Sequence, residues 1–555
     1  MDAPTNSPHY DVVIVGAGFS GLYMLHRLRG AGFKTHVFER ARDVGGTWYW
    51  NRYPGARCDI ESMQYAYSFS PELEQDWEWT ERYATQPEIL RYVNHVAGRF
   101  DLRRDIQFNT RVAAAIFDET DSRWMIETSD GGRTSANYCV IATGCLSTIN
   151  TPNFEGLESF AGSLYHTGEW PHHEIDFSDQ QVGIIGTGSS AIQSIPLIAE
   201  QAKHLYVFQR TPHYTVPACN QPLQTDPRTQ HSGRKAYGYD EDLTMEEIKA
   251  DYLGLRQRAR KTFAALAFTP NPRSALEMTE TERQQEFENR WKRGGLPFQG
   301  VFRDFAVSRE ANELAAEFVR QKIQHIVKDS VVAEALLPTY TIGCKRLAVD
   351  TGYYETYNRP NVTLVNVSKS PIERITPAGV YALGREYPLN SLIMATGFDA
   401  MTGTLLKINI QGRGGLRLHE KWAEGPRAYL GLCLAGFPNL FTITGPGSPS
   451  VLTNMLLSIE QHVDWIVDCL EYLRDRNIAE IEPTLEAENE WVTHNNEVAS
   501  DHIRNSCSSW YVGGNIEGKP RVFMPYVGGF PNYVEKCRNI AATGYKGFVL
   551  RGVGS

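Results

Sequence analysis

The sequence predicts an α/β fold made of two Rossmann-like dinucleotide-binding domains with a helical insertion. The main observation is a glycine-rich motif that occurs twice, at residues 16–21 (GAGFSG) and 186–191 (GTGSSA). Each motif follows a short apolar run and precedes residues with helical spacing, which is the strand–turn–helix context of a dinucleotide site. Each unit also closes with Ala-Thr-Gly, at residues 142–144 and 395–397. One such motif is weak evidence, but two in the same arrangement favour two nucleotide sites.

The first unit has the expected order of elements. The apolar run 10–15 is typical of a buried parallel strand, residues 20–29 have helical spacing, and residues 35–39 are a predicted second strand. Residues 111–143 then alternate apolar and polar side chains around a turn at 130–132. This alternation predicts a β-meander that ends in a buried strand.

The residues of the first motif indicate which nucleotide it binds. Gly16 makes the tight turn, Gly18 lets the backbone approach a pyrophosphate at the helix N-terminus, and Gly21 lets the helix pack closely on the strand. Glu39 follows the second strand, where it can accept hydrogen bonds from ribose hydroxyls and would repel a 2′-phosphate. The first site therefore suits FAD or NAD, and not NADP.

Residues 45–59 (GGTWYWNRYPGARCD) are unusually rich in glycine, proline and tryptophan. Paired glycines allow backbone contact with a ligand, and large aromatic rings can wall a planar one. We interpret this stretch as the bed of a flavin, with Gly46, Thr47 and Trp48 among the cofactor-binding residues. A structural turn with core tryptophans is the alternative.

The second unit repeats the plan with one difference. A predicted strand at 181–185, a helix at 190–199 and a strand at 204–208 are followed by no acid, but by Arg210 and Thr211. A guanidinium and a hydroxyl at this position suit the 2′-phosphate of NADPH. The cofactor-binding residues expected in this unit are Gly186, Gly188, Ser189, Ser190, Arg210 and Thr211.

Residues 215–330 are predicted to be a helical insertion in the second unit. Residues 245–268 and 308–337 are charged and amphipathic with helical spacing, and residues 290–295 break that pattern. We see no chemistry specific to this region. It can shape a substrate pocket or the domain interface, and simple surface packing is an equal alternative.

The C-terminal segment is expected to return to the first domain, because a Gly/Pro turn at 445–450 precedes a predicted helix at 452–473. The expected domains are 1–145 (first part of the FAD-binding domain), 146–214 (first part of the NADP-binding domain), 215–330 (helical insertion), 331–390 (second part of the NADP-binding domain) and 391–555 (second part of the FAD-binding domain).

Composition excludes several classes of function. The 555 residues carry a net charge of −10 with no Lys/Arg run, which argues against nucleic-acid and anionic-membrane partners. The polar N-terminus lacks the apolar region of a signal peptide, and no apolar stretch is long enough to span a membrane. Nine scattered cysteines without C-x-x-C fit reduced thiols in the cytoplasm and argue against a zinc ribbon or a dithiol pair. No coiled-coil heptads are visible, so a monomer is expected.

Between the two glycine motifs lies the stretch 160–171 (FAGSLYHTGEWP). Its F-x-G-x-x-x-H-x-x-x-W-P spacing resembles the fingerprint of type I Baeyer–Villiger monooxygenases, class B flavoprotein monooxygenases that convert ketones to esters or lactones. The resemblance extends from about residue 11 to residue 545 and is closest to the branch of phenylacetone and steroid monooxygenases. A plain linker with a core phenylalanine and a satisfied histidine is the alternative interpretation of this stretch alone.

Two dinucleotide sites imply that NADPH reduces FAD, and three fates of the electrons compete. A disulfide reductase needs a cysteine pair, and Cys58 stands alone in the flavin-proximal stretch. Transfer to a metal or haem needs ligands that the sequence does not cluster, although a separate partner protein stays possible. A monooxygenase needs only O₂, a dry pocket and a cation.

The resemblance assigns roles to individual residues. Arg346, in 342–347 (IGCKRL), matches the active-site arginine of the family, which implies that it stabilises a C4a-peroxyflavin as the peroxide attacks a ketone carbonyl. Asp59 is implied to orient Arg346, and Lys345 to bind the 2′-phosphate of NADPH together with Arg210. Trp510 is implied to be a hydrogen-bond donor beside the cofactor. We expect His166 of the fingerprint to couple the domains.

The ketone itself is left open by the sequence. It depends on residues expected to line the pocket, such as Cys145, Leu146 and 450–452, and on the insertion. Two other functions are compatible with two nucleotide sites: an N- or S-oxygenating flavin monooxygenase, whose fingerprint would lack Trp170, and a non-catalytic NADPH sensor. The presence of Asp59, Arg346 and Trp510 argues against the sensor.

Overall fold

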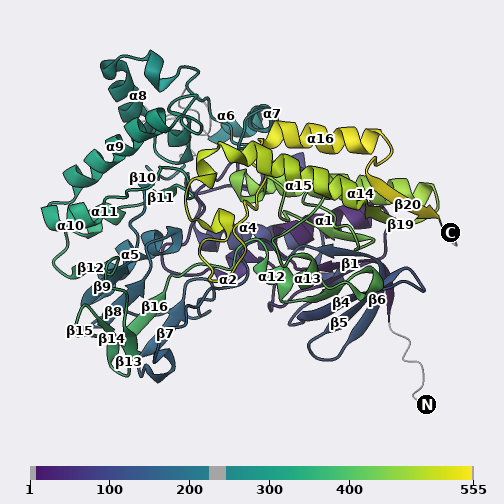
Figure 1. Ribbon diagram of the computed structural model, residues 1–555, viewed down its shortest axis with the longest axis horizontal. Helices are drawn as coiled ribbons and strands as arrows, with labels where there is room; N and C mark the ends of the chain where they lie inside the picture. Colours follow the sequence, from purple (N-terminus) through teal and green to yellow (C-terminus); the bar gives the residue numbers. More distant parts are fainter. Residues whose placement is uncertain (1–7, 224–244, 553–555) are drawn as a thin grey trace.

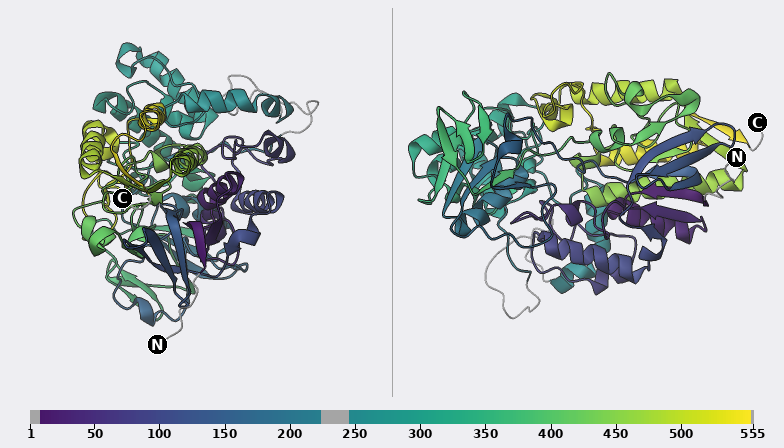
Figure 2. Two further views of the ribbon diagram at one scale, coloured as in Figure 1. Left: turned by 90° about the vertical axis from the view of Figure 1, so that its right-hand side faces the viewer. Right: turned by 90° about the horizontal axis from the view of Figure 1, so that it is seen from below.

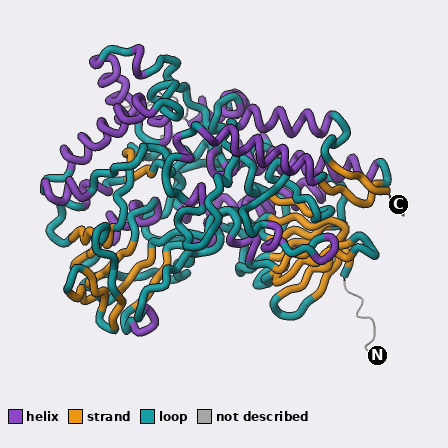
Figure 3. The backbone as a smooth tube through the Cα atoms, in the orientation of Figure 1, coloured by secondary structure: helices purple, strands orange, loops and turns teal. Residues whose placement is uncertain are grey.

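A computed structural model describes residues 8–223 and 245–552 of the chain (Figure 1). The N-terminal residues 1–7, on which the absence of a signal peptide was argued, and residues 224–244 of the expected insertion lie outside the described residues. The strands form two main groups at opposite ends of the molecule, with helices above and between them (Figure 3). The two groups correspond to the two glycine motifs.

The first sheet has the strand order β17-β4-β5-β6-β1-β2-β3, and β18 also pairs with β6. Its centre is parallel, with Ile14 of β1 opposite both Val37 of β2 and Val140 of β6. The pairs β4·β5 and β5·β6 are antiparallel, which confirms the predicted meander. The strands are β1 (His9–Val15), β2 (Thr35–Phe38), β3 (Ile106–Gln107), β4 (Val112–Asp118), β5 (Arg123–Thr128), β6 (Arg133–Ile141), β17 (Asn409–Gln411) and β18 (Leu440–Thr442).

Helices from both ends of the chain cover this sheet. The helix after the first glycine motif, α1 (Phe19–Gly30), packs against α14 (Met455–Asp475), which the sequence predicts at 452–473. The right-hand view of Figure 2 shows the C-terminal helices beside the first sheet. The C-terminal segment thus returns to the first lobe. Its other elements are α15 (Leu485–Ser500), α16 (Phe530–Ala542) and the antiparallel pair β19 (Ile478–Pro483) and β20 (Phe548–Gly552).

The second sheet is fully parallel, in the order β12-β9-β8-β16-β7. Val182, Leu205 and Leu392 are completely buried in it. Because β16 pairs with β8 and β7, it belongs to the second domain, and the return to the first domain comes after residue 394 and not at residue 391 as expected. The elements are β7 (Ser163–His166), β8 (Gln181–Ile185), α5 (Ser189–Gln201), β9 (His204–Gln209), β12 (Val362–Asn366) and β16 (Ser391–Met394), with a small meander of β13 (Arg374–Thr376), β14 (Gly379–Ala382) and β15 (Arg385–Pro388).

The insertion is helical but is divided differently from the prediction. Each of the two predicted amphipathic stretches contains two helices, and a further helix, α8 (Glu280–Arg293), lies between them. The break expected at 290–295 is the end of α8, where Gly294 terminates the helix. The other elements of this region are β10 (Thr215–Pro217), which pairs with β11 (Ala348–Asp350), and α6 (Met245–Ala250), α7 (Tyr252–Arg260), α9 (Arg309–Ile326), α10 (Ser330–Ala335) and α11 (Tyr353–Thr356).

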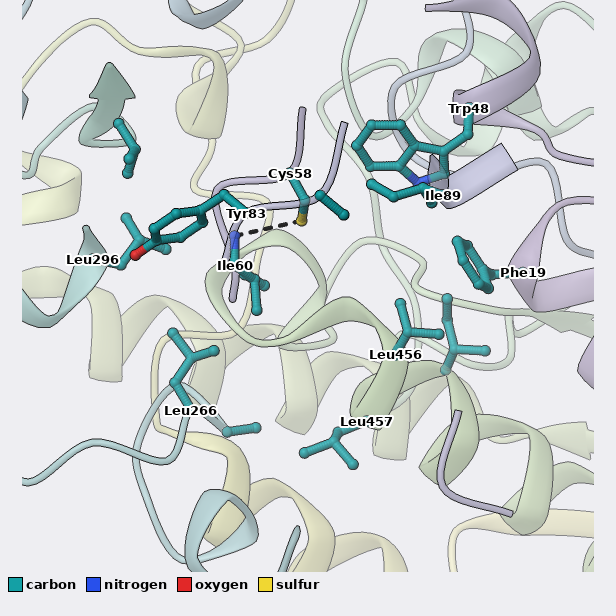
Figure 4. Close-up of a cluster of buried hydrophobic side chains, with 14 of the residues drawn as sticks. Phe19, Trp48, Cys58, Ile60, Tyr83, Ile89, Leu266, Leu296, Leu456 and Leu457 are labelled. Atoms are coloured by element: carbon teal, nitrogen blue, oxygen red, sulfur yellow. Dashed lines mark hydrogen bonds between the residues drawn. The ribbon is translucent and has the colours of Figure 1, made fainter. Parts of the chain in front are cut away.

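The insertion packs against the first lobe. Arg256 of α7 is buried, donates hydrogen bonds to the carbonyls of Gln64 and Ala66, and pairs with Glu74. Figure 4 shows Leu266 and Leu296 of the insertion in the same apolar cluster as Cys58 and Ile60, next to Leu456 and Leu457 of α14. The insertion therefore forms part of the wall beneath the 45–59 stretch.

The remaining elements are turns and helices outside the sheets. Those in the first lobe are α2 (Thr47–Trp50), α3 (Pro71–Asp76), α4 (Gln86–Arg99), α12 (Gly403–Leu406) and α13 (Leu418–Lys421), and single 3₁₀ turns are η1 (Arg103–Asp105), η2 (Leu157–Ser159), η4 (Ala275–Glu277), η5 (Leu296–Gly300), η6 (Arg413–Gly415), η7 (Ser450–Leu452), η8 (Ile503–Asn505) and η9 (Trp510–Val512). Within residues 8–223 and 245–552, no helix has the length and apolar character needed to cross a membrane.

Candidate active site

The first glycine motif forms an anion cradle at the start of α1. Gly18 is the N-cap, and no described side chain caps this helix, so its first N–H groups are left for a ligand. A Cβ on Gly18 would lie 3.3 Å from Cα of Gly46, which shows how closely the motif approaches the 45–59 stretch. The two glycine-rich segments therefore meet face to face, and any larger side chain would narrow the space between them.

Glu39 is buried at the edge of this cradle, with 6% of its surface exposed. Its carboxylate accepts hydrogen bonds from the backbone N–H of Ala17 at 2.6 Å and of Ala41 at 2.7 Å. Burial raises its pKa, and the two backbone bonds oppose that shift. Glu39 thus holds the glycine turn itself, a role that the sequence did not predict.

The 45–59 stretch, which we predict to bind a flavin, contains a buried tryptophan as well as an exposed threonine. Trp48, on α2, is 7% exposed (Figure 4). Its indole donates to the hydroxyl of Tyr65 at 3.2 Å. Thr47, at the start of the same helix, is exposed. The alternative of a core tryptophan thus describes Trp48 well, while Gly46 and Thr47 are the residues open to a ligand.

Asp59 ends this stretch and binds Arg346 from the second domain. Arg346 Nε donates to one carboxylate oxygen at 2.6 Å and Nη2 to the other at 2.9 Å, which is the two-pronged geometry that holds a guanidinium in one orientation. Arg346 Nη1 also donates to the carbonyl of Val451 at 2.6 Å. Burial would lower the pKa of Arg346, but Asp59 outweighs burial and raises it. The guanidinium is thus a fixed, permanently charged group.

Two residues that the sequence analysis missed lie around Arg346. Tyr511 is 2% exposed, and burial raises its pKa although Arg346 and Arg504 act against that shift. Burial and the charge of Arg346 lower the pKa of Arg504, so the two guanidinium groups lie near each other. Arg504 also donates to Oε1 of Gln299 in the insertion at 3.1 Å. The spacing of the sequence gave no signal for either residue, because their partners come from distant segments.

The second glycine motif is built in the same way. Gly188 is the N-cap of α5, again without a capping side chain among the described residues, and a Cβ on Gly186 would lie 2.4 Å from the carbonyl oxygen of Ala395. Arg210 is exposed at the end of β9. Burial and the charge of Arg210 both lower the pKa of Lys345, which indicates that the two cations lie near each other. The structure therefore brings together the two residues expected at a 2′-phosphate.

Ser189, Ser190 and Thr211 complete this second motif. Ser189 begins α5. Thr211 contributes its backbone carbonyl, which accepts from the hydroxyl of Thr187 at 2.7 Å.

The 160–171 stretch touches both glycine-rich sites. The backbone N–H of Trp170 donates to the carbonyl of Trp50 at 3.2 Å, and the hydroxyl of Thr167 lies 3.0 Å from that of Ser190. His166 Nε2 lies 3.3 Å from both the carbonyl of Asn150 and the hydroxyl of Thr396. Burial lowers its pKa, so the ring is neutral near pH 7. These contacts are consistent with a residue that couples the two domains. They also give His166 hydrogen-bond partners, as the alternative interpretation of this stretch expects.

The residues expected to line the substrate pocket gather in one apolar cluster. Cys145, Val451 and Leu452 are buried, with Leu146 and Trp510 packed against them. The indole of Trp510 has no protein acceptor among the described residues and is 4.3 Å, between ring centroids, from Tyr511. Because Val451 also receives Arg346, this cluster and the Asp59–Arg346 pair belong to one site.

One expectation from the cysteines is wrong. Cys344 and Cys507 form a disulfide across a sequence separation of 163, with their Cα atoms 6.0 Å apart. The other seven cysteines lie outside this bridge. No sequence pattern indicates this bridge, because the two cysteines come from separate loops that only the fold brings together. The chain is therefore not composed of reduced thiols alone, and it does contain a cysteine pair.

Comparison with known proteins identifies the family. The model of the family "Pyridine nucleotide-disulphide oxidoreductase" matches residues 13–248. A "Baeyer-Villiger monooxygenase" from Pseudooceanicola batsensis is 41% identical over 544 residues, which cover 97% of this chain and 96% of that protein. The chain belongs to the Baeyer–Villiger monooxygenases.

The relatives of this chain are named for different substrates. The structure described as "Oxidized steroid monooxygenase bound to NADP" is 51% identical, covers 98% of this chain and 99% of that one, and superposes with a TM-score of 0.91. A "Phenazine N-monooxygenase PhzNO1" from Lysobacter antibioticus is 40% identical over 98% of this chain and 97% of that protein. A Baeyer–Villiger fold is thus compatible with a relative named for oxygenation at nitrogen.

Proposed function

We propose that this protein catalyses the NADPH- and O₂-dependent oxidation of ketones to esters or lactones. The observation that carries the proposal is the two-pronged Asp59–Arg346 pair, which lies between the flavin-proximal stretch and the apolar cluster. In a Baeyer–Villiger monooxygenase, such a pair supplies a fixed positive charge where a reacting oxygen becomes negative.

The first site fits FAD. The uncapped start of α1 offers N–H groups to a pyrophosphate, Gly18 and Gly46 leave room for it, and the carboxylate of Glu39 suits ribose hydroxyls. When bound there, FAD supplies the redox chemistry, taking a hydride from NADPH and activating O₂. The chain itself binds and orients the ligands and excludes water.

The second site fits NADPH. Arg210 and Lys345 provide two neighbouring positive charges, which suit the 2′-phosphate that distinguishes NADPH from NADH. Gly186 and Gly188 open the cradle for the pyrophosphate at the start of α5. We propose that Trp510 donates its indole hydrogen bond to a ligand at this site.

Arg346 is the residue we propose to act on the substrate. A guanidinium carries five N–H bonds, and three of them go to Asp59 and Val451. Arg346 also forms a side-chain hydrogen bond with Tyr511. We propose that the N–H left over holds the carbonyl oxygen of a ketone. As negative charge develops on oxygen, this hydrogen bond strengthens, which lowers the barrier.

The test is product analysis with purified protein, FAD, NADPH and O₂. Linear, cyclic and steroidal ketones are offered in parallel, and an aromatic N-heterocycle is included because of the relative named for phenazine. We expect an ester or lactone, with about one product per NADPH oxidised. Formation of an N-oxide with no ester would favour the N-oxygenating alternative. NADPH bound but not oxidised would identify a sensor.

We also propose that the protein is a monomer in the cytoplasm that acts without nucleic acid or membrane. The support is the net charge of −10, the lack of coiled-coil heptads in the sequence, and the seven of nine cysteines that lie outside the disulfide. Light scattering of the purified protein tests the monomer, and a mass near 62.6 kDa is the expected result. Twice that mass would overturn it.

A further inference from the structure

We propose that the Cys344–Cys507 disulfide is a positioning element of the active site, and that a dithiol reductant opens it and uncouples NADPH oxidation from oxygenation. This inference rests on the proposed function and adds a redox control to the same site. It concerns residues to which neither the fingerprint nor the glycine motifs gives a role.

The bridge joins two loops that both carry site residues. Cys344 lies two positions before Arg346, and Cys507 lies three positions before Trp510 and four before Tyr511. Their sequence separation is 163, so the two loops come from different parts of the chain. One covalent bond therefore ties the loop of Trp510 to the loop of the proposed catalytic arginine.

Neither loop is held by extended regular structure. Residues 336–347 lie between α10 and β11, and residues 501–513 contain only the single turns η8 and η9. The backbone of Ile503 donates to the carbonyl of Ala306, and Arg504 donates to Gln299, so the start of the second loop rests on the insertion. Ordering such a loop costs conformational entropy for every residue, and a cross-link lowers that cost by restricting the alternatives.

The two sides of the active site depend on the bridge to different degrees. Arg346 is held independently by Asp59 and by the carbonyl of Val451. Tyr511 reaches Arg346 from the second loop, and Trp510 packs beside Tyr511. The bridge limits how far this loop can move from the loop of Arg346. Opening the bridge should therefore leave Arg346 in place and release Trp510, which we propose to contact the nicotinamide nucleotide.

A reductant can approach the bridge from the surface. Cys344 is fully buried, whereas Cys507 is partly exposed. An open surface hollow of about 480 Å³ is lined by Thr341 and by Ser506, the neighbour of Cys507. The lining also includes Arg309 of the insertion. The geometry favours attack at the sulfur of Cys507.

The exchange balances with a dithiol as the reductant. A thiolate of the dithiol bonds to the sulfur of Cys507, the S–S bond breaks, and Cys344 leaves as a thiolate that takes up a proton. The second thiol of the reductant then displaces Cys507 as a thiol. Two electrons pass to the protein, which gains two thiols, and the reductant becomes a cyclic disulfide. Hydrogen peroxide or a disulfide oxidant reverses the change.

The experiment compares the protein before and after treatment with dithiothreitol, which is removed under anaerobic conditions before assay. Thiol titration in denaturant should give seven thiols before treatment and two more after it. In the reduced protein, we expect KM for NADPH to rise about fivefold or more, a typical size for coupling between a site and a distant constraint. The fraction of NADPH that yields ester should fall, with hydrogen peroxide as the other product, and FAD content should be unchanged.

Two variants and a second readout separate positioning from general stability. Cys507→Ser should behave like the reduced protein and no longer respond to dithiothreitol. Cys219→Ser, at an exposed cysteine outside the bridge, should respond like the unchanged chain. Hydrogen–deuterium exchange should become faster in peptides covering residues 503–513 and stay unchanged in β1 and α1. If Cys507→Ser fails to fold, the unchanged chain measured before and after dithiothreitol treatment still tests whether the disulfide positions the loop.

Three outcomes would overturn the inference. Nine thiols before treatment would show that the bridge does not form. Opening of the bridge without a change in KM, coupling or exchange at 503–513 would show that it positions nothing. Faster hydrogen–deuterium exchange throughout the molecule would show that the disulfide only stabilises the whole fold. If no ketone is oxygenated but the local exchange changes as expected, the proposed function fails while the bridge still positions the loop.

Discussion

The two dinucleotide sites begin with nearly the same glycine motif but differ in the residue after the second strand, which is a buried acid at the first site and an exposed base at the second. At the first site, Glu39 is buried and fixed by the backbone N–H groups of Ala17 and Ala41. At the second site, Arg210 is exposed, and the ammonium group of Lys345 lies over the ring of Tyr340, 4.6 Å from the ring centroid. The residue that follows the second strand is thus buried in the protein core at the first site and exposed to solvent at the second.

This difference suits the two ligands. A cofactor that stays bound through many turnovers can be enclosed by core residues, whereas a cosubstrate that leaves after each turnover needs an accessible site. Charges at an exposed site can also steer a phosphate ligand toward it. We therefore propose that the glycine motif defines where a nucleotide binds, while the residue after the second strand selects which nucleotide binds there.

The largest expected effect comes from the residue that joins the two sites. Arg346→Ala should lower the rate of ester formation by about 10²–10³ or more, the usual cost of removing a positioned donor. FAD content and reduction of the flavin by NADPH should persist, because the glycine motifs are untouched. Product formation and anaerobic flavin reduction are measured on the same preparation.

Arg346→Lys is the matched control. Lysine keeps the positive charge but cannot make the two-pronged contact with Asp59. The rate of ester formation by Arg346→Lys should therefore lie between those of Arg346→Ala and the unchanged chain. Ester formation by Arg346→Ala at a rate near that of the unchanged chain would remove Arg346 from the mechanism.

The second prediction tests the open site. Arg210→Ala should weaken NADPH binding by about 1.5–3 kcal/mol, the usual contribution of a hydrogen bond to a charged group, and leave NADH almost unaffected. Calorimetric titration of both nucleotides gives the comparison directly. Arg359→Ala, at another exposed arginine of this domain, should change neither. Equal weakening of NADPH and NADH would mean that Arg210 does not contact the 2′-phosphate.

The third prediction tests the enclosed site. Glu39→Gln replaces one of two accepting oxygens with an NH₂ group, so the N–H of Ala17 or of Ala41 loses its acceptor. An unsatisfied buried donor costs about 1–3 kcal/mol, which should appear as a lower free energy of unfolding and as loss of FAD during purification. Urea unfolding and flavin absorbance measure the two effects.

Glu169→Gln provides the control for this change. Glu169 pairs with Arg40 at the surface, where an ion pair contributes at most about 1 kcal/mol. If Glu39→Gln is no more destabilising than Glu169→Gln, the backbone contacts of Glu39 do not hold the glycine turn.

What the sequence could predict was local. The two glycine motifs, the meander and the helix α14 are each written in a continuous stretch, and their patterns fix strands, turns and helices. Helix α8 was missed because it is highly charged and buries only Phe287, which leaves little amphipathic signal. The capping box at its start, between Thr279 and Glu282, was the available signal.

The rest of the site was not predictable from patterns because it depends on contacts between distant segments. Asp59 and Arg346 are 287 positions apart, and their pairing was implied only by the family resemblance. The Cys344–Cys507 bridge and the approach of Arg504 to Arg346 follow no motif at all. The boundary at β16 was misplaced for a related reason, since a parallel strand shows its sheet only through its partners.

The smallest expected effect is a pH dependence that belongs to the open site alone. Burial and the charge of Arg210 lower the pKa of Lys345. As pH rises through this lowered pKa, Lys345 loses the positive charge that we propose to bind the 2′-phosphate. NADPH affinity should therefore fall at a lower alkaline pH than an ordinary lysine would cause, by a few-fold, while NADH affinity stays level.

Two variants sharpen this last comparison. Arg210→Ala removes one of the two causes, so the pKa of Lys345 should rise and the loss of NADPH affinity should move to higher pH. Lys345→Arg should abolish the loss, because a guanidinium stays protonated throughout this range. Titration of NADPH and NADH binding between neutral and alkaline pH measures all three forms. A parallel fall for NADH, or an unchanged profile in Lys345→Arg, would show that another group titrates and that the two cations do not act together.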